Sequence, residues 1–178
     1  MTPQEIRAKR LVNDYKEMLN IRGDIIQWRI VRGEPPNVEE YELTVNIRSI
    51  INDIPTYRDK HIVRVYISDK YPVIAPRIEM ISSPCVFHPN WYQNGLWDYG
   101  SWIISESLAY HVIRMIKTLQ YDVDIINEYS PSNNTAKDWY VSNRNQGIFP
   151  CDKTNLPDPT KNKMIFNAQQ KKKFNINS

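Results

Sequence analysis

Alternation of apolar and polar residues over residues 41–47 constrains the fold of this chain more than any other stretch. Such alternation is typical of a half-buried β-strand, because successive side chains point to opposite faces. The pattern recurs over residues 26–30 and 63–67, and a shorter run at 77–81 gives a fourth strand. Successive strands of this kind favour an antiparallel meander with one face covered by helices. Residues 49–60 are polar and irregular, so we expect a long connection there.

Helical patterns lie on both sides of these strand segments. Residues 2–5 read Thr-Pro-Gln-Glu, a capping box with proline at the first helical position, so we predict a helix over residues 2–20. Apolar residues at helical spacing predict a second helix over residues 108–119, with Ser105 as a candidate cap, and a short third helix begins after Asn134 or Thr135. The predicted class is α+β: an N-terminal helix, a four-stranded antiparallel meander, a long structured loop, and C-terminal helices.

Length and composition indicate one folded domain followed by a tail. The chain has 178 residues, of which 41% are hydrophobic and 24% charged, and these values fit a globular domain. We expect that domain to span residues 1–156 and a lysine-rich, disordered tail to span residues 157–178, with binding of an anionic partner by the tail as the alternative. We find no apolar run long enough to cross a membrane and no signal peptide, so we expect a cytoplasmic protein without a membrane partner.

The net charge of +3 comes from the tail. Five lysines and no acidic residue lie after residue 159, and removing their charges leaves −2 for residues 1–159. A nucleic-acid-binding domain is expected to carry a basic face on its body. The charge distribution therefore argues against a nucleic-acid partner.

The cysteines and histidines form no metal-ligand pattern. Cys85 and Cys151 are too few for a disulfide framework, and His61, His88 and His111 are scattered along the chain. We therefore expect no metal site and no cofactor. Each thiol is interpreted first as an ordinary reduced cysteine, Cys85 being a small apolar filler.

Turn-forming proline, glycine and asparagine residues are concentrated at residues 71–102. This stretch contains Tyr-Pro-Val-Ile-Ala-Pro at 71–76, His88-Pro89-Asn90, an Asn-Gly turn at 94–95 and Gly-Ser-Trp at 100–102. Five of the twelve residues at 91–102 are aromatic. Turn residues at this density predict an ordered loop, and we expect a functional site there although its centre holds no strong nucleophile.

These motifs, in this order, resemble the ubiquitin-conjugating fold, which ubiquitin-conjugating enzymes share with their inactive variants and, more distantly, with RWD domains. Residues 71–76 are similar to the family's Tyr-Pro-x-x-Pro-Pro, with Ala75 in place of a proline. Leu-Gln-Tyr at 119–121, Ser-Pro-x-Asn at 130–133 and Ala-x-x-Trp-Tyr at 136–140 are similar to bacterial members. The resemblance covers about residues 2–152.

The resemblance also identifies an anomaly at Asp98. Active members have a cysteine eight residues after the asparagine of His-Pro-Asn, often in the pattern Cys-x-Gly-x-Trp, and counting from Asn90 or back from Gly100 and Trp102 gives Asp98. The family's chemistry needs a thiolate that holds the modifier as a thioester. A carboxylate would form a mixed anhydride, which water hydrolyses far more readily, so we expect no thioester on Asp98. The resemblance implies that His88 and Pro89 fix a turn and that Asn90 assists an oxyanion or orders the loop.

Three functions follow from the resemblance. The first is a catalytically inactive ubiquitin-conjugating-enzyme-like protein that serves as a binding or scaffold module in a ubiquitin-like conjugation pathway. Its expected partners are a ubiquitin-like modifier, an activating enzyme or an active conjugating enzyme. The second is an active enzyme that forms the thioester on a displaced cysteine, either Cys85 or Cys151. The third is an RWD-like structural interaction domain. We favour the first, because Asp98 opposes the second and His-Pro-Asn opposes the third.

The resemblance also implies where partners bind. The family uses its first helix and two loops. The five aromatic residues at 91–102 are interpreted first as packing on the meander, and those that are exposed would add contact area. At 103–105 this chain has Ile-Ile-Ser where active members often have Ser-Pro-Ala, which argues against recognition of a standard ligase. The predicted binding residues are Arg7, Arg10, Ile67, Trp97, Tyr99, Ile103 and Ile104.

Overall fold

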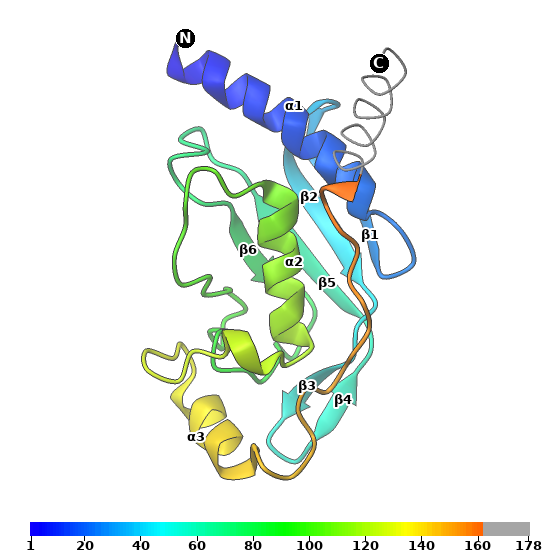
Figure 1. Ribbon diagram of the computed structural model, residues 1–178, viewed down its shortest axis with the longest axis vertical. Coiled ribbons are helices and arrows are strands. Elements are labelled where there is room, and N and C mark those ends of the chain that lie inside the picture. The colour runs from blue at the N-terminus through cyan, green and yellow to red at the C-terminus, as the bar shows by residue number, and fades with distance from the viewer. Residues whose placement is uncertain (162–178) are drawn as a thin grey trace, which may run out of the picture.

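The four predicted strand segments form one antiparallel sheet. The computed structural model, which describes residues 1–161, places β1 (Ile26–Glu34), β2 (Asn37–Val45), β5 (His61–Tyr66) and β6 (Arg77–Met80) side by side in that order (Figure 1). Each strand is antiparallel to its neighbour. The chain is α+β, with an N-terminal helix before the sheet and the remaining helices after it, so the predicted class is confirmed.

The strand register gathers the apolar residues on one face of the sheet. Trp28 lies opposite Leu43 and Leu43 lies opposite Val63, while the alternate row pairs Arg29 with Glu42 and Glu42 with Arg64. The first row is buried and the second is joined by ion pairs on the other face. Alternation read from the sequence therefore identifies the face that packs against the helices.

Residues 49–60 are not the irregular connection that we expected. They form a hairpin of β3 (Ser49–Asn52) and β4 (Thr56–Arg58), apart from the main sheet. The polar side chains that suggested a loop make the turn itself, because Asn52 and Asp53 each accept a hydrogen bond from the next backbone amide. Ile50 is fully buried and anchors the hairpin in a small cluster with Tyr121 and Tyr140.

The helices begin at polar caps. Helix α1 (Pro3–Ile21) starts with the predicted capping box, in which the Thr2 hydroxyl accepts from the Glu5 amide and the Thr2 amide donates to the Glu5 carboxylate. Helix α2 (Leu108–Leu119) is capped by Ser107 instead of Ser105. A 3-10 helix η1 (Val123–Ile125) precedes α3 (Asn134–Asn143), whose cap is Asn133 instead of Asn134 or Thr135. The predicted helices are confirmed, with caps displaced by one or two residues.

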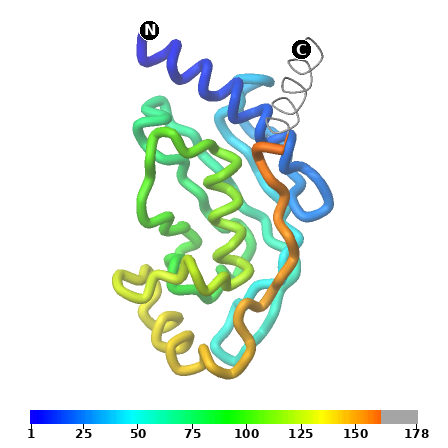
Figure 2. Tube along the Cα trace, in the orientation of Figure 1, coloured from blue at the N-terminus to red at the C-terminus, as the bar shows by residue number. Residues whose placement is uncertain are grey.

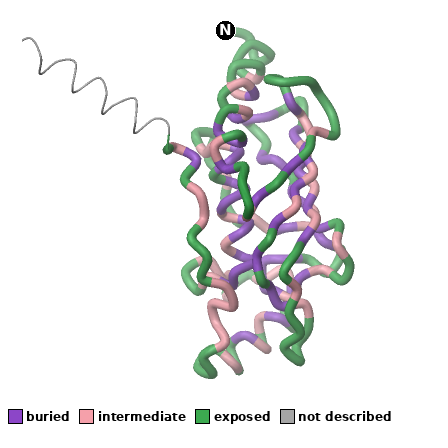
Figure 3. Tube along the Cα trace, turned by 90° about the vertical axis from the view of Figure 1, so that its right-hand side faces the viewer, coloured by how far each residue is buried: buried purple, intermediate pink, exposed green. Residues whose placement is uncertain are grey.

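Helices α1 and α2 contact each other, and both lie on the apolar side of the sheet (Figure 1). Buried residues line the space between these layers, whereas the ends of the molecule and its loops are exposed (Figure 3). Within this core the carboxylate of Asp14 on α1 accepts the Tyr71 hydroxyl at 2.5 Å and the Leu108 amide at 3.0 Å. One side chain thus joins α1, the loop before β6 and the first turn of α2.

The chain after α3 returns along the body as an extended strap, residues 150–160 (Figure 2). The Cys151 amide donates to the Gln120 carbonyl, and further along the Asn20 side chain donates to the Pro159 carbonyl at 3.1 Å. Order was expected to end at residue 156, but residues 157–161 still belong to the described fold because Pro159 is buried against α1. Residues 162–178, the rest of the expected tail, lie outside the described residues.

We predict that glycine is required at position 95, in a turn whose backbone bonds to Met80 at the end of β6. Gly95 has φ +97°, and an added Cβ would lie 2.8 Å from the Met80 carbonyl oxygen. We expect Gly95→Ala to lower the free energy of unfolding by about 1–3 kcal/mol, measured by urea denaturation. Gly23→Ala is the matched control, since no atom lies within 4 Å of its Cβ, and it should change stability by less than about 0.5 kcal/mol. Equal effects of the two substitutions would contradict the prediction.

Candidate functional site

The His-Pro-Asn tripeptide forms a buried turn behind the site. Nδ1 of His88 accepts the Asn90 amide at 2.9 Å, and the His88 ring packs 4.3 Å from that of Tyr121. Complete burial lowers the pKa of His88 to about 3, so the imidazole is neutral at physiological pH. His88 therefore holds the turn and is poorly suited to act as a general base, as the sequence indicated.

Asn90 ties this turn to the segment around η1. Its Oδ1 accepts the Asn127 amide at 2.9 Å and its Nδ2 donates to the Ile125 carbonyl at 2.8 Å, while its backbone carbonyl accepts the Asp98 amide. Both the oxygen and the nitrogen of the side-chain amide are thus hydrogen-bonded to backbone groups. Of the two roles that the resemblance implied for Asn90, this arrangement matches loop ordering.

Asp98 lies beside Asn90 and is bonded on both carboxylate oxygens. Oδ2 accepts the Ser132 hydroxyl at 2.6 Å, and Oδ1 accepts the Gly100 amide at 2.9 Å. The Ser132 amide in turn donates to the Pro89 carbonyl. Asp98 therefore links its own loop to the segment before α3, and short hydrogen bonds to a carboxylate are among the stronger ones.

A cavity of about 320 Å³ opens in front of Asn90 and Asp98. Asp124, Asn127 and Arg114 also line it, together with the aromatic side chains of Trp97 and Tyr99. The guanidinium of Arg114 is held in an ion pair with Glu106 at 2.7 Å. The cavity is therefore polar, and its charged groups are largely engaged with protein atoms.

Sequence reasoning missed two residues that line this cavity and one that bonds to Asp98. Ser132, Asn127 and Arg114 were not predicted, although each bonds directly to a predicted residue or to its loop. Ser132 occupies the unspecified position of the Ser-Pro-x-Asn run, so the motif gave no reason to select it. Arg114 lies on α2 and donates to the Tyr99 carbonyl across fifteen residues, a separation over which no local pattern carries information.

Trp97 is not the exposed contact that its predicted binding role requires, although it borders the cavity. Its side chain is buried at 4% exposure, because the ring packs 4.9 Å from His111 on α2. Tyr99 and Trp102 pack around the same histidine at 5.4 and 5.0 Å and are partly buried. The aromatic residues of the loop thus mainly anchor it to α2. Tyr99 also lines the cavity, and its binding role stays a prediction.

Ile67 is also wrongly predicted as a surface contact. It is 1% exposed, because it follows directly after β5 and its side chain continues the apolar row of that strand into the core. Exposed positions begin with Ser68, whose carbonyl accepts the Arg7 side chain at 3.1 Å. The predicted loop is therefore at the surface, but this isoleucine is not.

Arg7 and Arg10 lie on α1 as predicted, yet their side chains bind the protein itself. Arg7 also pairs with Glu39 at 2.8 Å. Arg10 donates to the carbonyl of Ile104 at 2.8 Å and to that of Glu106. These guanidinium groups hold the two adjacent loops in place, and direct contact with a partner stays untested for both.

Ile103 and Ile104 are exposed, at 62% and 57%. Val73 and Ile74 are exposed on a second loop, and the Trp102 indole donates to the Pro72 carbonyl at 2.8 Å and so ties the two loops together. We call these four side chains the apolar patch. Exposed apolar side chains gathered on neighbouring loops mark candidate protein-binding surfaces.

Neither thiol lies in the cavity. Burial raises the pKa of Cys85 to about 11 and that of Cys151 to about 12. Cys151 lies at the start of the strap, where its Sγ is 3.2 Å from the Arg48 carbonyl. Both groups are protonated at pH 7, and a protonated thiol is a poor nucleophile.

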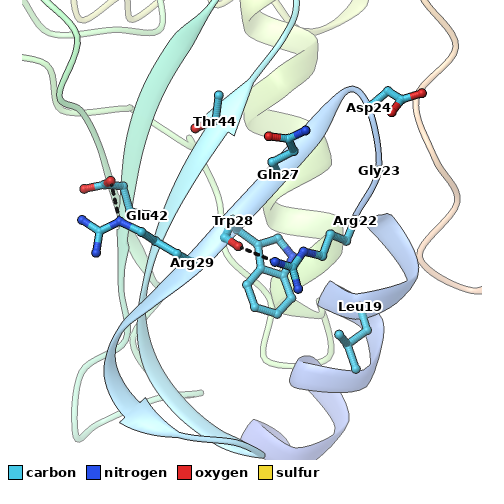
Figure 4. A pocket seen from close by; sticks show the side chains of 9 residues that line it. All are labelled: Leu19, Arg22, Gly23, Asp24, Gln27, Trp28, Arg29, Glu42 and Thr44. Carbon is cyan, nitrogen blue, oxygen red and sulfur yellow. Dashed lines mark hydrogen bonds and ion pairs between the residues drawn. The ribbon is translucent and has the colours of Figure 1, made fainter.

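A second hollow, of about 650 Å³, lies at the C-terminal end of α1 (Figure 4). The Arg22 guanidinium lies 4.5 Å from the Trp28 ring centre and donates to the Trp28 carbonyl, while Arg29 pairs with Glu42. Among the described residues that line it there is no cysteine, histidine or serine. We therefore place the candidate site at Asp98, despite the smaller volume of its cavity.

Comparisons with known proteins assign no family, since neither the family models nor the curated proteins contain a match to this chain. Within residues 1–161, no three histidine, cysteine or carboxylate side chains are grouped to hold a metal ion. No helix in that part of the chain has the length and apolar character needed to cross a bilayer.

Three buried histidines should make the protein acid-sensitive. Burial lowers the pKa values of His61, His88 and His111 to about 4, 3 and 4, from 6.5. Below pH 6.5 these histidines therefore bind protons in the unfolded chain but stay neutral in the folded chain. The free energy of unfolding consequently falls as the pH drops from 6.5 towards 4. Each histidine contributes a slope of up to about 1.4 kcal/mol per pH unit to the free energy of unfolding, measurable by urea denaturation.

His111→Gln tests this assignment. In this variant the slope of the free energy of unfolding against pH, between pH 6 and 4.5, should be smaller by up to about 1.4 kcal/mol per pH unit, whatever the absolute stability of the variant. Tyr110→Gln, at an exposed neighbouring position, should leave the slope unchanged. A slope that stays the same in His111→Gln would contradict the assignment.

Proposed function

We propose that this chain is a non-catalytic protein-binding module whose site frame resembles that of ubiquitin-conjugating enzymes. The observation that carries the proposal is the bonding of Asp98. Its carboxylate stands where the resemblance expects a thiol, and both of its oxygens accept hydrogen bonds from Ser132 and Gly100. A group engaged in this way serves the architecture of the loop, and a carboxylate cannot form a thioester.

The surrounding geometry supports the same proposal. The His88–Asn90 turn, the loop to Trp102 and the segment around Asn127 are joined by hydrogen bonds, so the frame of the site persists without its nucleophile. The displaced-cysteine alternative is not favoured, because Cys85 and Cys151 do not line the cavity and burial raises both pKa values. At pH 7 a thiol of pKa about 11 is ionised in about one molecule in ten thousand.

The apolar patch is the surface that we assign to partner binding. Its loops are fixed by Arg10 and by the Trp102 indole, so little conformational freedom would be lost on docking. The partners we propose are a ubiquitin-like modifier, its activating enzyme or an active conjugating enzyme. An RWD-like interaction domain is the competing proposal, and it predicts binding without any dependence on a modifier pathway.

Thiol chemistry tests the loss of catalysis directly. Incubation with an activating enzyme, ATP and a ubiquitin-like protein should give no adduct that reduction removes. Asp98→Cys should add one thiol that iodoacetamide alkylates at least about tenfold faster than Cys85 or Cys151, because it faces the cavity, whereas those two thiols are partly buried and have raised pKa values. The substitution should also lower stability by about 1–3 kcal/mol, since it removes both acceptors.

The matched control is Ser132→Cys, which introduces a thiol at the donor end of the same hydrogen bond. A reducible adduct on the wild-type chain that disappears in Cys85→Ala or Cys151→Ala would overturn the non-catalytic proposal in favour of the displaced cysteine. Equal alkylation of all thiols in Asp98→Cys would contradict the assigned geometry.

Ile104→Asp tests the apolar patch. We expect it to weaken binding of a modifier or conjugating-enzyme partner at least about tenfold by calorimetry, because a charge would be desolvated at the contact. The stability of the chain should stay within about 0.5 kcal/mol of wild type, since Ile104 is exposed. Ile54→Asp, at the exposed tip of the β3–β4 hairpin, should leave binding unchanged. If both variants bind as wild type does, the patch is not the surface.

A further inference from the structure

Asp14 is a buried ionisable group for which the proposed function has no use. It is 1% exposed, and its carboxylate lies where α1, the loop before β6 and α2 meet. Both loops that carry the apolar patch are attached at this junction. The first loop begins just after Tyr71, and the second ends just before Leu108. A change in the charge of Asp14 therefore acts at the base of the patch.

Arg10 connects that charge to the patch. Its Nε lies 3.3 Å from Asp14 Oδ2, one helical turn away on α1. The two terminal nitrogens of the same guanidinium donate to the carbonyls of Ile104 and Glu106. The planar guanidinium can make these contacts together only when its position is fixed, and the Asp14 carboxylate is the anion that fixes it.

The surroundings of Asp14 favour proton uptake. Burial raises the pKa of Asp14 above its usual 3.8, against the opposing effects of the Tyr71 hydroxyl, the Leu108 amide and Arg10. The charged or titratable groups that face it are Arg10 and Glu17 on α1, Tyr41 on β2 and Tyr71 on the loop. Because the pKa is raised, Asp14 takes up a proton during acidification earlier than an ordinary aspartate does.

We propose that Asp14 and Arg10 form an acid-sensitive latch that fixes the Ile103–Ile104 loop when the carboxylate is charged and releases it when a proton binds. The inference rests on the proposed function, since it concerns regulation of the apolar patch. Protonation removes the charge that attracts Arg10 and converts one acceptor oxygen into a donor. The guanidinium then loses its fixed position, and the loop carbonyls of Ile104 and Glu106 lose their donors.

Nuclear magnetic resonance on the full-length chain tests the latch without any partner. The Asp14 carboxyl carbon and the Ile104 amide are followed between pH 7.5 and 4, with the histidine ring signals recorded in the same spectra. We expect the carboxyl and the amide to titrate with one shared midpoint above 3.8. Amide exchange over residues 103–106, corrected for intrinsic pH dependence and for the global loss of stability that exchange in β2 reports, should accelerate about tenfold across that midpoint.

Two variants separate the latch from the titration of the histidines. Asp14→Asn carries no titratable group at this position, so the Ile104 amide should stop titrating while the histidine signals still do. Tyr71→Phe removes a donor to the carboxylate and should raise both midpoints together; it also decides the question if Asp14→Asn does not fold. An Ile104 amide that keeps its titration in Asp14→Asn, or whose midpoint stays fixed in Tyr71→Phe, overturns the latch.

The outcome is distinct from a failure of the proposed function. A loop that titrates on a chain whose Ile104→Asp variant loses no partner binding supports the latch and overturns the assigned surface. A loop that ignores Asp14 on a chain whose patch binds a partner overturns the latch alone.

Discussion

The buried carboxylate of Asp14 is the contact on which the relative placement of the layers depends. It receives hydrogen bonds from Tyr71 and from the first amide of α2, and it pairs with Arg10 on its own helix. Burying a charge is favourable only when it is paired and hydrogen-bonded, and Asp14 meets that condition through three separate segments. Losing any one donor leaves the remaining charge poorly compensated, so the junction is cooperative.

The site at Asp98 is organised in the same way on a smaller scale. Asn90 holds the backbone of Ile125 and Asn127, and Asp98 holds the Ser132 hydroxyl, so each side chain joins segments distant in sequence. In the function that we propose, the central side chain of this loop holds the loop together, because both oxygens of the Asp98 carboxylate accept hydrogen bonds. We infer that a carboxylate at this position strengthens the loop at the expense of reactivity, a trade that active sites commonly make in the opposite direction.

Much of the fold was predictable because its signals are local. Alternation fixed the sheet and its buried face, and the capping box placed the start of α1 correctly. The β3–β4 hairpin was missed because short polar residues indicate both loops and tight turns, and only the burial of Ile50 distinguishes them. Within the site, burial was the part that sequence could not supply: Trp97 and Ile67 look like surface contacts until α2 and the continuing strand cover them.

The strap returns to a defined point on α1. Pro159 is held by Asn20 near the last turn of α1, whereas Arg10, which supports the apolar patch, lies ten residues earlier on the same helix. Ten helical residues span about 15 Å. The strap therefore meets α1 about 15 Å along the helix from the arginine that supports the apolar patch, and the length of α1 sets that separation.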